Sequence, residues 1–231
     1  ITTDDTGIAK VSGLPLGKYY VKEKATVNGF VLDNEAREID LTYRDQDTAE
    51  VTYSADWQNN RQKAEVEVVK KEKDSDCVLE GAVFALCAKN DITGADGNVI
   101  LEADTVIEEL ATDKEGKLTF TADLPIGFEY YIKETSPAPG FATTDETQEF
   151  TFEYEGAEKE KVSYVFTFED EPTVIEITKT SLTDGKELEG AKLQVTDESG
   201  KVVDSWTSGK EAHIIKELVV CLLYTSPSPR D

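Results

Sequence analysis

Three charged residues in the middle of the chain, Lys70, Glu134 and Asp170, have the side-chain types needed for covalent chemistry between side chains. Each continues the alternate positions that carry apolar residues in its predicted strand, so all three side chains are expected on the buried face. Three separate buried ions would be prohibitive, whereas a paired cluster is tolerable. The phase of the three strands therefore predicts that these side chains meet.

Such a cluster has two interpretations. The simpler one is a buried salt-bridge cluster, which is often neutral or costly for stability. The more specific one is an intramolecular isopeptide bond, in which the Lys70 amine attacks the side-chain carbonyl carbon of Asp170 and water leaves. Glu134, protonated because it is desolvated, would polarise that carbonyl and relay protons. Strand phase alone does not choose between the two.

The same pattern recurs along the chain. The motif Leu-Pro-x-Gly occurs at residues 14–17 and 124–127, and the strand after it ends in Glu23 or Glu134. Leu14 and Leu124 are 110 positions apart, and the two glutamates are 111 apart. A repeat of this length indicates a tandem array of one small domain.

The repeat places equivalents of the cluster on both sides of it. Glu23 and Asn59 stand where Glu134 and Asp170 stand, and with Asn59 the leaving group would be ammonia. Lys179 stands 109 positions after Lys70. Glu23, Asn59 and Lys179 are therefore the matching site residues of partial neighbouring domains.

The elements that must position these residues are short strands separated by turns, with little helical periodicity. This spacing predicts an antiparallel β-sandwich, in which the first and last strands are commonly neighbours. Residues 149–154 and 162–169 are expected to form a hairpin. The predicted strands cover residues 38–41, 51–57, 65–71, 79–86, 106–110, 118–121, 129–134, 149–154, 162–169 and 173–179.

We expect three domains with almost no linker between them. Residues 1–61 are the C-terminal part of a first domain, 62–171 a complete second domain, and 172–220 the N-terminal part of a third. Residues 221–231 resemble a translated sequencing adapter and are set aside from the fold. The chain is expected to be a piece of a longer protein.

Composition excludes several function classes. The 48 acidic and 24 basic residues give a formal net charge of −24, which disfavours nucleic acid or an anionic membrane surface as a partner. No apolar run is long enough for a membrane helix. The residues Cys77, Cys87, Cys221 and His213 show no zinc spacing, so we expect no metal and no cofactor, and leave a Cys77–Cys87 disulfide open.

The motifs carry a family resemblance. Leu-Glu-Gly-Ala-x-Phe-x-Leu at residues 79–86, the run from Leu124 to Phe141, and Asp170-Glu171-Pro172 are similar to SpaA-like, Cna B-type prealbumin-like domains. The resemblance implies tandem all-β sandwiches of prealbumin-like, inverse immunoglobulin-like fold, arranged as beads on a string. In that family a first-strand Lys, a Glu and a last-strand Asn or Asp form the cross-link, which matches Lys70, with Lys71 as second candidate, Glu134 and Asp170.

The resemblance also implies a function. Such domains are stalk modules of Gram-positive surface adhesins and pilins, so we expect an extracellular, cell-wall location and covalent peptidoglycan attachment through a sorting signal outside this chain. The protein would not be an enzyme beyond a single-turnover cross-link. The alternative is a direct binding module that contacts a host matrix protein or a glycan through loops such as residues 91–104.

Overall fold

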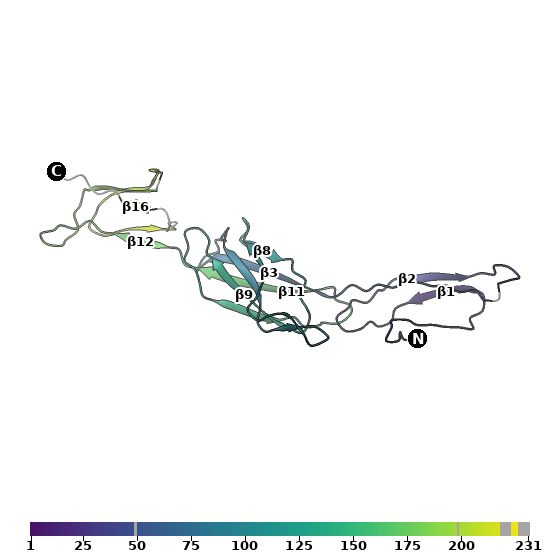
Figure 1. Cartoon of the computed structure of the whole chain (residues 1–231). Coiled ribbons are helices and arrows are strands. Elements are labelled where there is room, and N and C mark those ends of the chain that lie inside the picture. The colour runs from purple at the N-terminus through teal and green to yellow at the C-terminus, as the bar shows by residue number, and fades with distance from the viewer. Residues whose placement is uncertain (49, 198, 218–222, 226–231) are drawn as a thin grey trace. The chain divides into compact units, whose positions relative to one another are not determined.

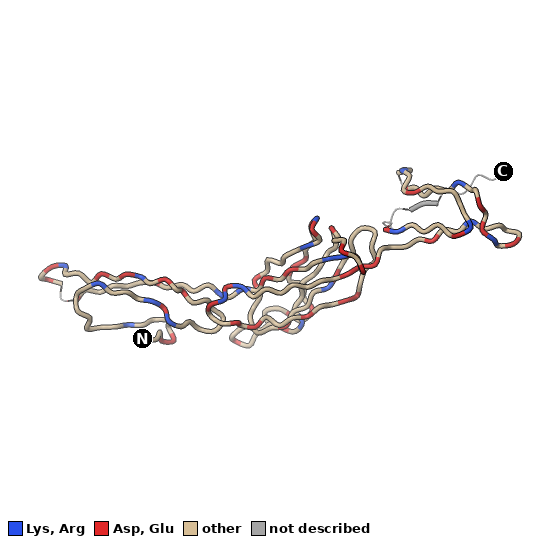
Figure 2. The backbone as a smooth tube through the Cα atoms, turned by 180° about the vertical axis from the view of Figure 1, so that it is seen from behind, with Lys and Arg blue, Asp and Glu red and all other residues tan. Residues whose placement is uncertain are grey.

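The computed structural model describes residues 1–48, 50–197, 199–217 and 223–225, and these contain sixteen strands and no helix. Figure 1 shows the strands of the chain, and the described residues divide into two compact units. The first unit holds residues 1–63 and 154–162, and the second holds the other described residues. Acidic residues occur along the whole described backbone (Figure 2), as the composition predicts.

The first unit contains one antiparallel pair, β1 (Gly17–Lys22) and β2 (Ala36–Leu41). Residues 154–162 join the rest of this unit through backbone hydrogen bonds, among them the Leu32 amide donating to Ala157 O at 2.9 Å. The buried side chain of Gln62 holds this segment in place, because its Nε2 donates to Gly156 O at 3.1 Å and to Lys159 O at 2.6 Å.

The second unit contains a β-sandwich of two sheets, with a small hairpin of β5 (Ile92–Thr93) and β6 (Val99–Leu101) at residues 92–101. In spatial order the four-stranded sheet is β10 (Thr147–Thr151), β9 (Glu129–Ser136), β4 (Val83–Ala88) and β7 (Val106–Ala111). The three-stranded sheet is β11 (Lys161–Asp170), β3 (Lys63–Glu72) and β8 (Lys117–Phe120).

The core lies between these sheets, as strand alternation predicts. Every second residue of β9 from Tyr130 to Glu134 is buried, and so are the alternate positions of β3 that end at Lys70. Phe84 on β4 and Phe168 on β11 meet across the sandwich with ring centroids 4.9 Å apart. The predicted sandwich and its inward faces are confirmed.

The first and last strands of the sandwich, β3 and β11, are neighbours. The amide of Lys63 donates to Glu160 O at 3.0 Å, and the amide of Lys73 donates to Asp170 O at 2.9 Å. Residue numbers rise together along the pair, so the two strands run parallel. Their C-terminal ends, which carry Lys70 and Asp170, therefore lie side by side.

The rest of the second unit follows β11 directly and forms two further sheets. One pairs β12 (Val174–Ile177) with β15 (His213–Lys216). The other has the order β14 (Val202–Thr207), β13 (Lys192–Asp197), β16 (Leu223–Thr225). Val195 and Ile215 form a small core with Ile175, Ile177 and Trp206. The adapter-like segment 221–231 and Cys221 lie outside the described residues, apart from residues 223–225.

Two secondary-structure predictions are wrong. Residues 51–57 form no strand, although their alternation favours one. The equivalent residues in the repeat lie in β11, which is a strand because it pairs with β3. The described part of the first unit holds no counterpart of β3, so residues 51–57 have no partner to pair with. The predicted hairpin also fails, because β10 and β11 join different sheets. The three-domain boundaries stay a prediction.

Candidate functional site

The candidate site is a buried cluster that joins three strands from both sheets. Lys70 on β3 places its Nζ 2.5 Å from Asp170 Oδ1 on β11. The same Nζ lies 3.0 Å from Glu134 Oε1 on β9. All three side chains have 0% exposure. The structure thus brings together the three residues that strand phase selected.

Glu134 is the group whose protonation the site perturbs most clearly. Burial raises the pKa of its carboxyl above the ordinary value, and the nearby Lys70 and the Thr144 amide only partly oppose this. That amide donates to Glu134 Oε2 at 3.2 Å. A raised pKa favours the protonated carboxyl, which is the form that can donate a proton to a neighbouring oxygen.

The hydrogen bonding of the cluster is incomplete. Asp170 Oδ2 is buried without a hydrogen-bond partner, and Glu134 Oε1, although close to the ammonium, has no hydrogen bond of good geometry. One ammonium and two carboxylates in full burial would carry a net negative charge. Converting the Lys70–Asp170 pair to an amide would remove two of these charges.

Local contacts hold Lys70 in place. Its amide donates to Gly116 O at 2.7 Å, and its carbonyl accepts from the Leu79 amide at 3.0 Å. Its Nζ lies 5.5 Å from the centroid of the Phe84 ring. Gly116 and Phe84 were not among the predicted site residues, since nothing in their spacing marks them as neighbours of a lysine.

Lys71 does not belong to the cluster. Its side chain is about one-third exposed and its Nζ lies 3.9 Å from Asp76. The alternation of β3 directs it to the opposite face from Lys70. The structure therefore favours Lys70 over the second candidate.

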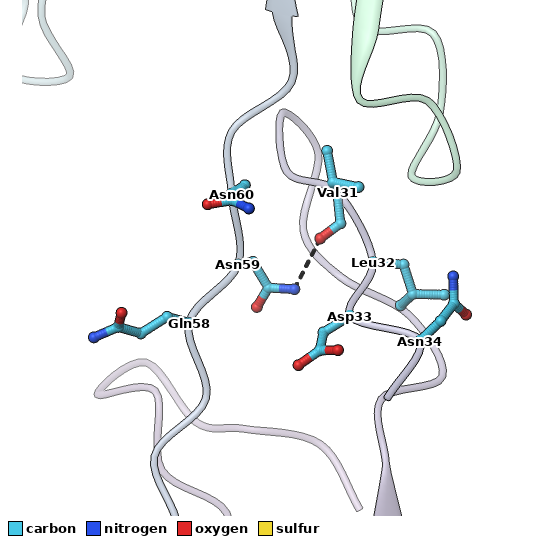
Figure 3. A pocket seen from close by; sticks show the side chains of 7 residues that line it. All are labelled: Val31, Leu32, Asp33, Asn34, Gln58, Asn59 and Asn60. Carbon is cyan, nitrogen blue, oxygen red and sulfur yellow. Dashed lines mark hydrogen bonds between the residues drawn. The ribbon is translucent and has the colours of Figure 1, made fainter. Parts of the chain in front are cut away.

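The matching residues of the first unit also meet. Asn59 Nδ2 donates to Glu23 Oε2 at 2.6 Å and to Val31 O at 2.9 Å. The amide of Asp33 donates to the same Glu23 oxygen at 2.8 Å. Beside them lies a pocket of about 310 Å³ (Figure 3). Its lining residues are Val31, Leu32, Asp33, Asn34, Gln58, Asn59 and Asn60.

Lys179 lies in the second unit, just after β12. It is half-buried, and within the described residues its Nζ pairs with no carboxylate. The structure thus assembles the Glu23–Asn59 pair but gives Lys179 no site partner.

The described residues offer little other chemistry. Cys77 is exposed and Cys87 is buried, and both are free thiols, so they form no disulfide with each other. No group of three or more potential metal ligands occurs in the described part of the chain. Likewise, no helix among those residues is long and apolar enough to cross a membrane.

A two-sheet sandwich whose parallel first and last strands share a buried Lys–Asp–Glu cluster defines a class of all-β structural domain. The family model "SpaA: Prealbumin-like fold domain" matches residues 1–57 and 64–165, which is more than half of the chain. The chain belongs to this family of prealbumin-like domains. No curated protein was found to match its sequence.

Several solved structures are similar to this chain. The Bacillus anthracis TIE protein is 28% identical with a TM-score of 0.53, and the match covers 93% of this chain and 36% of that one. A streptococcal ancillary pilin is 21% identical over 89% of this chain and 64% of its own, with a TM-score of 0.36. Domains D2 and D3 of the Corynebacterium diphtheriae major pilin SpaD are 22% identical over 47% and 46%, with a TM-score of 0.32. This chain thus spans about a third of the TIE protein.

Proposed function

We propose that this chain is a structural stalk segment of a Gram-positive surface protein, and that its middle domain is locked by a Lys70–Asp170 isopeptide bond. The observation that carries the proposal is the 2.5 Å approach of Lys70 Nζ to Asp170 Oδ1 beside Glu134, in full burial. Membership of the SpaA prealbumin-like family supports a place on the cell surface. Covalent attachment to peptidoglycan, through a sorting signal elsewhere in the protein, belongs to the same proposal.

The proposed reaction is a dehydration within the folded domain. Nζ of Lys70 bonds to Cγ of Asp170, one Asp170 oxygen leaves, and the two hydrogens lost from the ammonium leave with it as water. Glu134 lies within reach of Nζ and carries protons from nitrogen to the departing oxygen. The product is a neutral amide, so the buried ammonium and one carboxylate disappear together.

The position of the bond suits a load-bearing stalk. Tension enters the middle domain at the start of β3 and leaves at the end of β11, because these are its first and last strands. A bond between Lys70 and Asp170 carries this tension directly from one strand to the other. The sheets between these two residues then bear none of it.

The test is the intact mass of the purified chain. We expect the wild-type protein to be lighter than its sequence by one water, and Lys70→Ala and Glu134→Ala to have their full masses. Asp170→Asn should reach the same final mass as the wild type, because loss of ammonia from asparagine yields the same amide. Lys71→Ala is the matched control and should still lose water. A wild-type chain of full mass would refute the bond.

Binding of a host matrix protein or a glycan through residues 91–104 stays a prediction. That segment contains the β5–β6 hairpin rather than an open loop, with Ile100 exposed near its end. A binding screen of the whole chain against collagen, fibronectin and glycans tests it.

A further inference from the structure

One turn occurs twice in the chain with the same backbone and a different sequence. Residues 27–30 read Val-Asn-Gly-Phe, and residues 138–141, 111 positions later, read Ala-Pro-Gly-Phe. In each turn the amide of the last residue donates to the carbonyl of the first, at 3.2 Å and 3.1 Å. The φ angles of Gly29 and Gly140 are 92° and 90°. A hydrogen bond across four residues with positive φ at the third is the pattern of a type II turn.

The second residue is the chemical difference between the two turns. Proline is common at this position of a type II turn, because its fixed φ matches the turn, and Pro139 follows that rule. Asn28 takes the same position in the first unit and is exposed to solvent. The turn itself therefore does not require an asparagine at position 28.

The residue after Asn28 makes this asparagine unusual within the chain. The sequence contains six asparagines, and Asn28 alone is followed by glycine. The backbone nitrogen that follows an asparagine can attack the side-chain carbonyl carbon, and a side chain on that next residue hinders the approach. Gly29 has no Cβ, so its nitrogen can approach Cγ of Asn28 closely once the turn opens.

The turn also holds a junction within the first unit. An isolated antiparallel bridge pairs residues 29–31 with residues 60–62, at the predicted boundary between the first and second domains. Beside this bridge the Gln62 amide donates to Gly29 O at 2.9 Å, and the Val31 amide makes a second backbone bond at 2.8 Å. We call these two paired segments the junction ladder.

The junction ladder holds residues 154–162 as well. The Tyr154 hydroxyl donates to Phe30 O at 3.0 Å, and the Leu32 amide donates to Ala157 O at 2.9 Å. A change in the backbone immediately before Phe30 would therefore affect the contacts of three separate segments of the first unit.

We propose that Asn28 is a site of spontaneous deamidation, and that its conversion to isoaspartate opens the junction ladder. The middle repeat has the same turn without this site, because Pro139 carries no side-chain amide. The chain then contains two turns of one geometry, of which one is chemically labile and the other is stable. The proposal is independent of the cross-link in the middle domain.

The reaction needs no reagent other than water. The nitrogen of Gly29 bonds to Cγ of Asn28 and the bond from Cγ to Nδ2 breaks. A solvent base carries the proton from the Gly29 nitrogen to Nδ2, which leaves as ammonia. Water then opens the cyclic imide. Attack at Cγ gives aspartate, whereas attack at the main-chain carbonyl carbon gives isoaspartate, in which the main chain runs through Cβ.

Isoaspartate changes the turn because it places one additional carbon in the main chain before Gly29. The hydrogen bond that closes a type II turn depends on the normal number of backbone atoms between its ends. With the longer main chain, Gly29 O moves away from the Gln62 amide, which loses its acceptor. The junction ladder then opens from this end.

The experiment ages the purified 231-residue chain at mildly alkaline pH, over a period in which the same chain unfolded in urea converts completely. Peptide mapping with enzymatic labelling of isoaspartate is the readout. We expect isoaspartate at residue 28 and not at the other asparagines, and a rate that rises with pH because the attacking nitrogen must lose its proton. Asn28→Pro reproduces the turn of the middle repeat and should gain no label. Absence of isoaspartate at residue 28 of the folded chain would overturn the modification.

Hydrogen exchange tests the structural consequence. After chromatographic separation of the isoaspartate form, the amides of Val31, Leu32 and Gln62 should exchange faster than in fresh protein by a factor of about three to ten, as expected for a lost backbone hydrogen bond. The amides of Ala142 and Thr173, their counterparts beside the turn of the middle repeat, are the internal control and should be unchanged. Unchanged exchange at the first three amides would overturn the opening of the junction ladder.

Discussion

A mechanical measurement gives the sharpest test of the middle cluster. Lys70 and Asp170 are 100 positions apart, so a bond between them encloses most of the middle domain. At about 3.4 Å per extended residue, the enclosed chain amounts to roughly 340 Å that tension cannot release. In Lys70→Ala this length becomes available, and the domain should unfold with an added extension of about that size.

The assay is single-molecule force spectroscopy with the chain held at its two ends. We expect the wild type to lack the long extension at forces that unfold Lys70→Ala. Lys71→Ala is the matched control, because it removes a neighbouring lysine whose side chain lies outside the cluster, and it should behave as the wild type. A long extension in wild-type molecules that have lost one water would refute the proposed load path.

The same bond should raise equilibrium stability. In the chain-entropy model, closing a loop of about 100 residues stabilises the folded state by roughly 4–5 kcal/mol. Lys70→Ala also leaves a buried Asp170 carboxylate with no cation beside it, which adds a cost of about 3–5 kcal/mol. Chemical denaturation monitored by Tyr and Trp fluorescence should therefore show a much lower midpoint for this variant, whereas an unchanged midpoint would contradict both contributions.

Two further predictions concern the cluster and its surroundings, and a third concerns Gln62 in the first unit. In Gly116→Ala the new Cβ would lie 2.6 Å from Val78 Cβ and 2.7 Å from the Lys70 carbonyl oxygen. This clash displaces Lys70, so the mass assay should show less cross-link. The control is Gly127→Ala, also at positive φ but in open space, which should cost about 1 kcal/mol of stability and keep the bond. Burial raises the pKa of Glu134, so the folded state binds its proton more tightly than the unfolded state does. Stability from this group is therefore full below its unfolded pKa and falls as pH rises through the folded pKa. Lys70→Ala, which cannot cross-link and keeps the burial and the Asp170 charge that raise this pKa, should accordingly have a lower urea midpoint at about pH 8 than at about pH 5, and adding Glu134→Gln should weaken this dependence. Gln62→Ala removes the side-chain amide that hydrogen-bonds to the backbone of residues 155–159. This loss should cost about 2 kcal/mol of local stability and speed the hydrogen exchange of the backbone amides of these residues. Unchanged exchange would contradict that role.

The sequence by itself determined the fold class and the identity of the cluster. Alternation along β3, β9 and β11 put Lys70, Glu134 and Asp170 on inward faces, because successive side chains of a strand point to opposite sides. The repeat then identified Glu23, Asn59 and Lys179 as counterparts. These features are local, or are visible as self-similarity, so the sequence alone reveals them.

Only the tertiary structure decided which strands pair and which atoms meet. Alternation in residues 51–57 predicted a strand, yet a strand needs a ladder partner, and the described first unit provides none. Residues 149–154 and 162–169 resembled a hairpin, yet the chain crosses between sheets there. Strand pairing depends on partners far apart in sequence, which local patterns do not specify.

Strand alternation ranked Lys70 above Lys71, and the structure supplies the distances that separate the two lysines. Adjacent lysines are chemically identical, and only the packing of β3 against β11 and β9 places one Nζ at 2.5 Å from Asp170 and leaves the other beside Asp76. The contacts of Phe84 and Gly116 with Lys70 also arise from this packing. The sequence supplied the charged groups, and the parallel pairing of the first and last strands placed Lys70 Nζ 2.5 Å from Asp170 Oδ1.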